Sequence, residues 1–132
     1  MIKFSLIWCE GAKIKLWMPE YFRMAPRREI ALAIGRGGCG PGHIGDKLVP
    51  DKIYGLNVRS ACKRHDMAWY LAETPEDRVL SDCMFLCNLL LLNDKYSNWF
   101  TRLWRLKALG CIYHYFEAVA YLGFKPEGVN YA

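Results

Sequence analysis

From about residue 57 onward, the pattern of apolar and polar positions predicts α-helices almost to the end of the chain. We expect these helices over residues 58–71, 75–92 and 98–122. The first third is apolar and basic by turns, and the element that we predict there is a short helix over 27–34. The glycine-rich segment 35–42 follows, and its composition excludes the interior of a helix or a strand. The expected fold is mainly α, with a long loop before its central helices.

Capping signals set the boundaries of the two central helices. Asn57 is suited to cap the first, because its side-chain oxygen can accept a hydrogen bond from a free N–H group of the first turn. Thr74 is a stronger signal for the second, since Pro75 follows it at the first helical position and Glu76 and Asp77 place negative charge in the first turn. A tight turn at this point makes the two helices an antiparallel pair.

Size and composition indicate one globular domain over residues 1–132. Hydrophobic residues make up 53% of the chain and charged residues 23%. The formal charge of +5 favours an anionic partner, and anionic lipid and nucleic acid both fit. No apolar run approaches the ~18 residues of a membrane-spanning helix, and the N-terminal apolar stretch is too short for a signal peptide.

The antiparallel pair brings a histidine and an aspartate to the same level. His65 lies eight residues before Glu73, and Asp82 lies eight residues after Thr74. Because both helices rise equally per residue, the two side chains face each other. A carboxylate that holds one ring N–H leaves the other imidazole nitrogen free to take a proton, which is the arrangement of a general base.

The first central helix also carries a candidate metal ligand. Cys62 and Asp66 are four residues apart and share a face, whereas His65 points roughly 100° away from Asp66. A disulfide between Cys39 and Cys62 would hold the glycine loop one helical turn from Asp66. Carbonyls of such a loop together with a carboxylate form the hard oxygen set that calcium prefers.

These segments resemble the phospholipase A2 family. Residues 38–42 (Gly-Cys-Gly-Pro-Gly) look like its calcium loop, residues 62–66 (Cys-Lys-Arg-His-Asp) like its active-site helix, and residues 81–85 (Ser-Asp-Cys-Met-Phe) like the segment with its second aspartate. The Gly-Pro-Gly loop and the His-Asp-x-Ala sequence are similar to the phospholipase domains of parvovirus capsids and phage-like proteins. The resemblance covers about 37–86, and we place the core over 37–93.

The resemblance implies calcium-dependent hydrolysis of the sn-2 ester of glycerophospholipids. His65 would remove a proton from water, Asp82 would steady the histidine, and the Gly40 N–H would share the developing oxyanion with the metal. Ca²⁺ would be held by the Asp66 carboxylate and by loop carbonyls of Gly38, Gly40 and Gly42. The partner would be a phospholipid bilayer, anionic for preference, and not a nucleic acid.

The chain departs from the family pattern at three positions. Trp69 stands where a tyrosine usually supports the second aspartate, and its indole N–H offers one replacement bond. Ala61 replaces a cysteine of a family disulfide, and His43 stands where a loop glycine is often found. We expect the Cys39–Cys62 bridge to be present. The pairing of the other four cysteines stays open: Cys9, Cys83, Cys87 and Cys111.

Other interpretations weigh less. A zinc site from Cys62, His65, Cys83 and Cys87 would ignore Asp66 and leave the glycine loop without a purpose. A catalytically silent membrane-binding or membrane-damaging module on the same fold is the main alternative, although such relatives usually lose the histidine or the metal ligands. A calcium-rich, oxidising setting suits an open calcium loop, so we expect a secreted or virion-associated protein.

The expected last helix allows two uses. Over 98–122, Trp99, Leu103 and Trp104 are interleaved with basic residues. This pattern is typical of a helix that lies on a membrane or of one that packs a single face into the core. We expect the second.

Overall fold

The computed structural model describes residues 1–34, 52–53 and 55–107 of the chain. This part is mainly helical, as predicted. It contains two small antiparallel sheets, a 3₁₀ turn over Glu20–Arg23 and four α-helices: α1 (Arg27–Ile34), α3 (Arg59–Leu71), α4 (Pro75–Tyr96) and α5 (Trp99–Lys107). Helix α1 has the predicted bounds.

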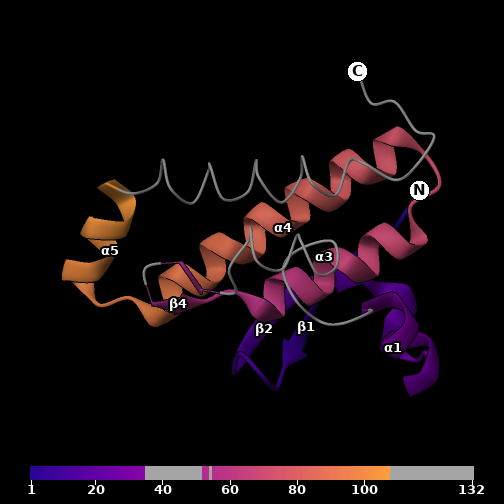
Figure 1. Ribbon diagram of the computed structural model, residues 1–132, viewed down its shortest axis with the longest axis horizontal. Helices are drawn as coiled ribbons and strands as arrows, with labels where there is room; N and C mark the ends of the chain where they lie inside the picture. Colours follow the sequence, from indigo (N-terminus) through magenta and orange to yellow (C-terminus); the bar gives the residue numbers. More distant parts are fainter. Residues whose placement is uncertain (35–51, 54, 108–132) are drawn as a thin grey trace.

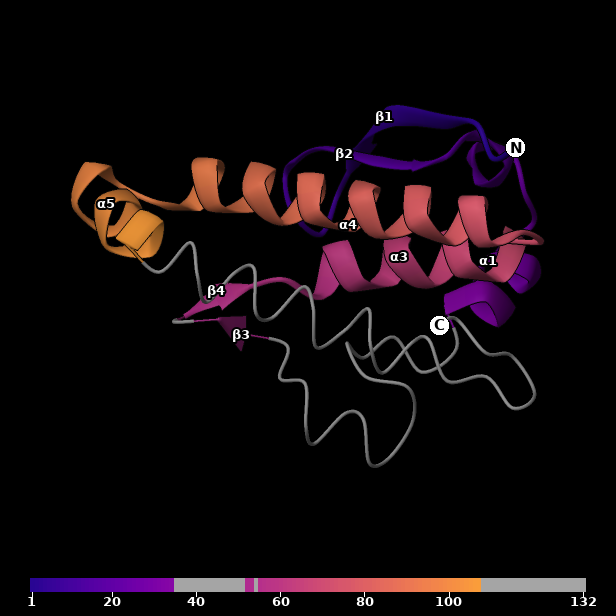
Figure 2. The same ribbon diagram turned by 90° about the horizontal axis from the view of Figure 1, so that it is seen from above.

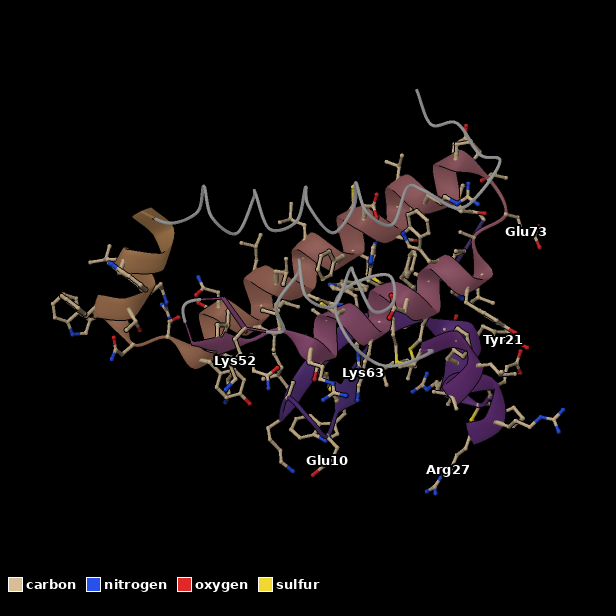
Figure 3. The ribbon with its side chains drawn as sticks, in the orientation of Figure 1. Glu10, Tyr21, Arg27, Lys52, Lys63 and Glu73 are labelled. Atoms are coloured by element: carbon tan, nitrogen blue, oxygen red, sulfur yellow. The ribbon has the colours of Figure 1, made fainter. Side chains whose placement is uncertain are left out.

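Helices α3 and α4 lie side by side as an antiparallel pair (Figures 1 and 2). Glu73 marks the turn between them (Figure 3). A capping box begins α4: the Thr74 hydroxyl accepts from the Asp77 N–H at 3.1 Å, and the Asp77 carboxylate accepts from the Thr74 N–H at 3.4 Å. The predicted start at Pro75 is therefore confirmed.

Helix α4 ends four residues later than predicted, at Tyr96 rather than at residue 92. Asn93 and Asp94 favour a helix end by local preference, but tertiary contacts outweigh that preference. Asn93 is buried, and the Tyr96 hydroxyl donates a hydrogen bond to the carbonyl of Ala12. These contacts stabilise the last turn of the helix.

Helix α3 begins one residue later than expected. Val58 occupies the N-cap position and supplies no side-chain cap. Asn57 serves the helix from one residue further out, because its Oδ1 accepts a hydrogen bond from the Arg59 N–H at 3.0 Å. Asn57 also ends the short strand β4 (Leu56–Asn57), which pairs with β3 (Lys52–Ile53).

The N-terminal hairpin was not predicted from the sequence. Strands β1 (Phe4–Cys9) and β2 (Ile14–Pro19) pair in antiparallel register from Phe4↔Pro19 to Cys9↔Ile14. Glu10 lies at the connecting turn (Figure 3). The hairpin lies along the α3–α4 pair (Figure 2).

Asn88 of α4 fixes the hairpin to the helices. Its amide accepts from the Trp17 N–H and donates to the Trp17 carbonyl, both at 2.8 Å. Leu16 beside it is fully buried. Burial of a side chain of this size contributes roughly 1.5–3 kcal/mol, so the hairpin is part of the core.

Two hydrophobic clusters fill the described part. The larger one joins the hairpin to α3 and α4 and includes Leu16, Val58, Ala61, Phe85, Leu89 and Leu92. The smaller one joins β2, the 3₁₀ turn, α1 and α3 through Met18, Phe22, Ala33 and Met67. Both clusters pack on α3, so the helix that carries His65 is held from two sides.

Candidate functional site

His65 and Asp82 meet between the two central helices. Nε2 of His65 lies 2.6 Å from Oδ1 of Asp82. The side chains are 5% and 7% exposed, so little water competes for the contact. The juxtaposition expected from the level of the two residues is present, and its use in catalysis remains a prediction.

Trp69 adds a second donor to the same carboxylate. Its indole N–H donates to Asp82 Oδ1 at 3.2 Å. Trp69 lies one turn beyond His65 on α3, so both donors come from one helix. Two donors on one oxygen fix the position of the carboxylate. The Trp69 indole therefore supplies the replacement hydrogen bond to Asp82 that was expected at this position, where the phospholipase A2 family usually has tyrosine.

Aromatic rings hold the imidazole in place. Phe85 stacks on His65 with ring centroids 4.7 Å apart and an angle of 27° between the planes. The Trp69 ring lies beside the same imidazole, with ring centroids 5.8 Å apart and an angle of 60° between the planes. These contacts restrict rotation of the ring about its side-chain bonds, so the imidazole is held in one orientation.

The hydrogen bond also determines which nitrogen can act as a base. An ionised carboxylate only accepts hydrogen bonds, so Nε2 is the donor to Asp82, and in the neutral imidazole Nδ1 is the nitrogen with the lone pair. Across the described ranges, the hydrogen bond of Nε2 to Asp82 is the one that His65 makes. Nδ1 is thus chemically suited to take a proton from water or an alcohol.

Phe85 and Arg78 belong to the surroundings of this pair, and sequence reasoning gave them no role. The Arg78 guanidinium lies 5.5 Å from the centre of the Trp69 ring, within cation–π range. Arg78 is four residues before Asp82 on α4, and Phe85 is three residues after it. This helical spacing was the signal that could have identified both.

Asp66 follows His65 on α3 and is partly exposed. The other predicted calcium ligands, Gly38, Gly40 and Gly42, lie outside the described residues. Within the described ranges, no three His, Cys, Asp or Glu side chains gather into a group that could hold a metal ion. A site built from loop carbonyls and one carboxylate needs no such group. Asp66 offers a hard oxygen donor with access to solvent, which fits calcium.

Asp77 lies in the first turn of α4, as expected, and its side chain also takes part in the capping box. A hydrogen bond from the Glu73 N–H, 3.2 Å from Oδ2, holds the pKa of the Asp77 carboxyl below its ordinary value of 3.8. Its side chain is committed to the start of α4. Asp82 is the carboxylate that faces His65.

The cysteines count against the zinc alternative. Cys62 is disulfide-bonded, and its partner lies outside the described residues. Cys83 and Cys87 are free and exposed, and Cys9 is free and buried. A sulfur in a disulfide is not a thiolate ligand, and His65 is directed at Asp82. The expected Cys39–Cys62 bridge stays a prediction, since Cys39 lies outside the described part.

A groove at the N-terminal end of α3 is separate from the His65–Asp82 pair. It is lined by Asn57, Ser60 and Lys63 together with Ala12 of the hairpin turn and Tyr96 of α4. The candidate chemistry therefore lies in the helix pair and not in this groove.

The chain matches no protein-family model, no curated protein and no solved structure. The resemblance to phospholipase A2 therefore rests on the residues of this chain and on the geometry described above. In the described ranges, no helix is both long and apolar enough to cross a membrane.

Proposed function

We propose that the protein is a calcium-dependent esterase of the phospholipase A2 type, with a phospholipase A2-like fold, that hydrolyses the sn-2 ester of glycerophospholipids. The observation that carries the proposal is the buried 2.6 Å contact between His65 and Asp82. Trp69 and Phe85 hold this pair in one orientation. A histidine so placed beside the motif Cys62-x-x-His65-Asp66 is suited to general base catalysis.

The protein's own residues would act on a water molecule. Nδ1 of His65 takes a proton from water as the oxygen attacks the ester carbonyl, and Asp82 stabilises the imidazolium that forms. The proton then passes from Nδ1 to the leaving glycerol oxygen as the carbon–oxygen bond breaks. The products are a fatty acid and a lysophospholipid, and no covalent acyl-enzyme is formed.

Calcium would be held by Asp66 and by the carbonyls of Gly38, Gly40 and Gly42. When bound, the ion polarises the ester carbonyl and attracts the phosphate of the substrate. The Gly40 N–H would contribute to the oxyanion site. Asp66 and His65 are adjacent on α3, so metal ligand and base are positioned by the same helix.

Product analysis with a mixed-chain phosphatidylcholine tests this proposal. The phospholipid carries different acyl chains at sn-1 and sn-2, and release is followed with calcium and with a chelator. We expect the sn-2 fatty acid alone, and only with calcium. Release of the sn-1 chain, or release that ignores the chelator, would contradict the assignment. No release at all, with binding to vesicles retained, would favour the catalytically silent membrane module.

A further inference from the structure

Helix α5 exposes its apolar residues. Trp99 is 74% exposed, Phe100 65%, Leu103 57% and Trp104 48%. Their spacing places these four side chains on one side of the helix, within about 140° of arc. The expectation that this helix packs one face into the core is wrong for this stretch. In Figure 1, α5 extends from the end of α4, away from α3.

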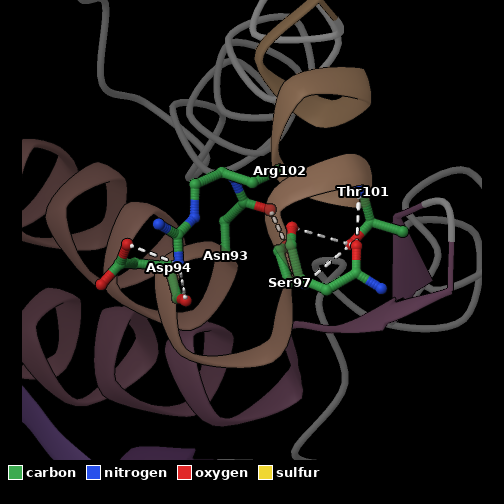
Figure 4. Close-up of polar contacts among 6 residues, drawn as sticks. Asn93, Asp94, Ser97, Thr101 and Arg102 are labelled. Carbon is green, nitrogen blue, oxygen red and sulfur yellow. Dashed lines mark hydrogen bonds and ion pairs between the residues drawn. The ribbon is translucent and has the colours of Figure 1, made fainter.

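Polar contacts hold the start of α5. Asn98 and Thr101 form a reciprocal cap: Asn98 Oδ1 accepts from the Thr101 N–H at 2.8 Å, and Thr101 Oγ1 accepts from the Asn98 N–H at 2.9 Å. On the α4 side, the Ser97 hydroxyl donates to Asn93 Oδ1 at 2.9 Å. Figure 4 shows these contacts around the elbow between α4 and α5.

Arg102 joins the two helices directly. Its guanidinium donates to the Asp94 carbonyl at 3.1 Å and lies 3.3 Å from the Asp94 carboxylate (Figure 4). Helical spacing places Arg102 on the side of α5 opposite Trp104. The polar side of α5 is therefore attached to α4, whereas Trp99, Phe100 and Leu103 on the apolar side are largely exposed.

The charge of α5 complements an anionic surface. The sequence Trp99–Lys107 contains three basic residues and no acidic residue, and the whole chain carries a formal charge of +5. Aromatic and aliphatic side chains gathered on one face of a basic helix are typical of helices that lie in the interface of a bilayer. Tryptophan in particular favours the level of the lipid head groups.

We propose that α5 is a membrane anchor that lies flat on an anionic phospholipid bilayer, with Trp99, Phe100, Leu103 and Trp104 inserted. The choice of a lipid partner rests on the proposed function, because a phospholipid esterase must bind the surface that holds its substrate. The anchor itself is separate from the catalytic pair. Asp82 and Tyr96 are fourteen residues apart on α4, so the end of α4, from which the chain continues into α5, lies about 21 Å along the helix from Asp82.

The experiment measures partition of the protein into sedimenting vesicles, with a chelator present so that no lipid is consumed. Vesicles of phosphatidylcholine are compared with vesicles that also contain phosphatidylglycerol. We expect the double variant Trp99→Ser, Trp104→Ser to bind the anionic vesicles at least tenfold more weakly than the native protein. Trp8→Ser is the matched control, since Trp8 is 53% exposed on the hairpin, and it should bind like the native protein.

Three outcomes would overturn the inference. The double variant binds like the native protein, or Trp8→Ser loses as much binding, or the native protein is a dimer that the double variant converts to a monomer. The last result would assign the apolar face to a second copy of the chain. Circular dichroism and thermal unfolding confirm that each variant is folded.

A second substrate separates this inference from the proposed function. Hydrolysis of a short-chain phosphatidylcholine, dissolved as monomers, requires the catalytic residues but no bilayer. We expect the double variant to retain native activity on monomers and to lose it on vesicles. If monomers are never hydrolysed but binding to vesicles still depends on α5, the proposed function fails and the anchor stands.

Discussion

The imidazole of His65 and the carboxylate of Asp82 are joined by a 2.6 Å contact, although the two residues lie seventeen positions apart on different helices. The chain reverses direction at the turn that contains Glu73, so α4 runs back along α3. This brings His65 and Asp82 to the same level. Trp69 and Phe85 then hold the two groups in place. A buried histidine oriented in this way differs from a histidine that merely fills space, because Nε2 is bound to a carboxylate that is itself held in place.

Asp82→Asn tests the role of the carboxylate. An asparagine can present its N–H to the imidazole and so reverse which nitrogen carries the proton. We expect kcat for phospholipid hydrolysis to fall by about 10²-fold or more, while the protein stays folded. Glu76→Gln, which neutralises an exposed carboxylate on the same helix, should leave the rate unchanged. Equal activity of Asp82→Asn and the native protein would show that Asp82 does not assist His65.

Trp69→Phe removes one of the two donors to Asp82. A hydrogen bond to a charged group contributes about 1.5–3 kcal/mol, so urea denaturation should show a free energy of unfolding lower by about that amount. We expect a slower reaction as well, because the carboxylate is held less firmly. Trp69→Tyr supplies a hydroxyl donor and should recover part of both losses. A Trp69→Phe variant as stable and active as the native protein would contradict this account of the indole.

Asp77→Asn should make stability less dependent on pH. Hydrogen bonds to the carboxylate keep the pKa of Asp77 below 3.8 in the folded protein. Its stabilising effect is therefore present above that value and is lost as the pH falls through the lowered folded-state pKa. At pH 7 the variant should melt at a lower temperature than the native protein, and the difference should shrink below pH 4. Thr74→Ser, which keeps the capping oxygen, is the control. A difference that is constant down to pH 2 would argue against the carboxylate cap.

Asn88→Ala should release the hairpin from the helices. The substitution leaves the N–H and carbonyl of Trp17 without their partners, at a cost of about 2 kcal/mol or more in the free energy of unfolding. Cys87→Ala, at the exposed neighbouring position, should change stability by no more than about 0.5 kcal/mol. Chemical denaturation of the two variants makes the comparison. Equal stability would mean that the hairpin is held by apolar packing alone.

The sequence predicts the helix pair well because its signals are local. Thr74 and Asp77 specify where α4 begins, and the constant rise of a helix then determines which residues of α3 and α4 face each other. The hairpin was not predicted, because β2 is a short segment in which only some residues are buried and Lys15 interrupts the apolar residues. Its alternation of exposed Lys15 with buried Leu16 and Met18 becomes evident once Asn88 is seen to bind Trp17.

The exposed face of α5 could not be predicted for a different reason. An amphipathic pattern specifies that a helix has an apolar side, but not whether protein or another phase covers it. In the structure, Asp94 at the end of α4 binds Arg102 on the polar side of α5. No local sequence pattern around Asp94 or Arg102 indicates that the two residues bind each other.

The most direct test of the central claim measures calcium-dependent release of fatty acid by two separate variants, His65→Gln and, as its control, Ser81→Ala. Glutamine keeps a side chain that can donate to Asp82 but cannot take a proton from water. Ser81 is buried next to Asp82 and donates to the Asp77 carbonyl at 2.7 Å, so its substitution disturbs the same region without touching the base. We predict that His65→Gln releases no fatty acid above background, while Ser81→Ala keeps most of the native rate. Native-like release by His65→Gln would contradict the assignment of His65 as the general base.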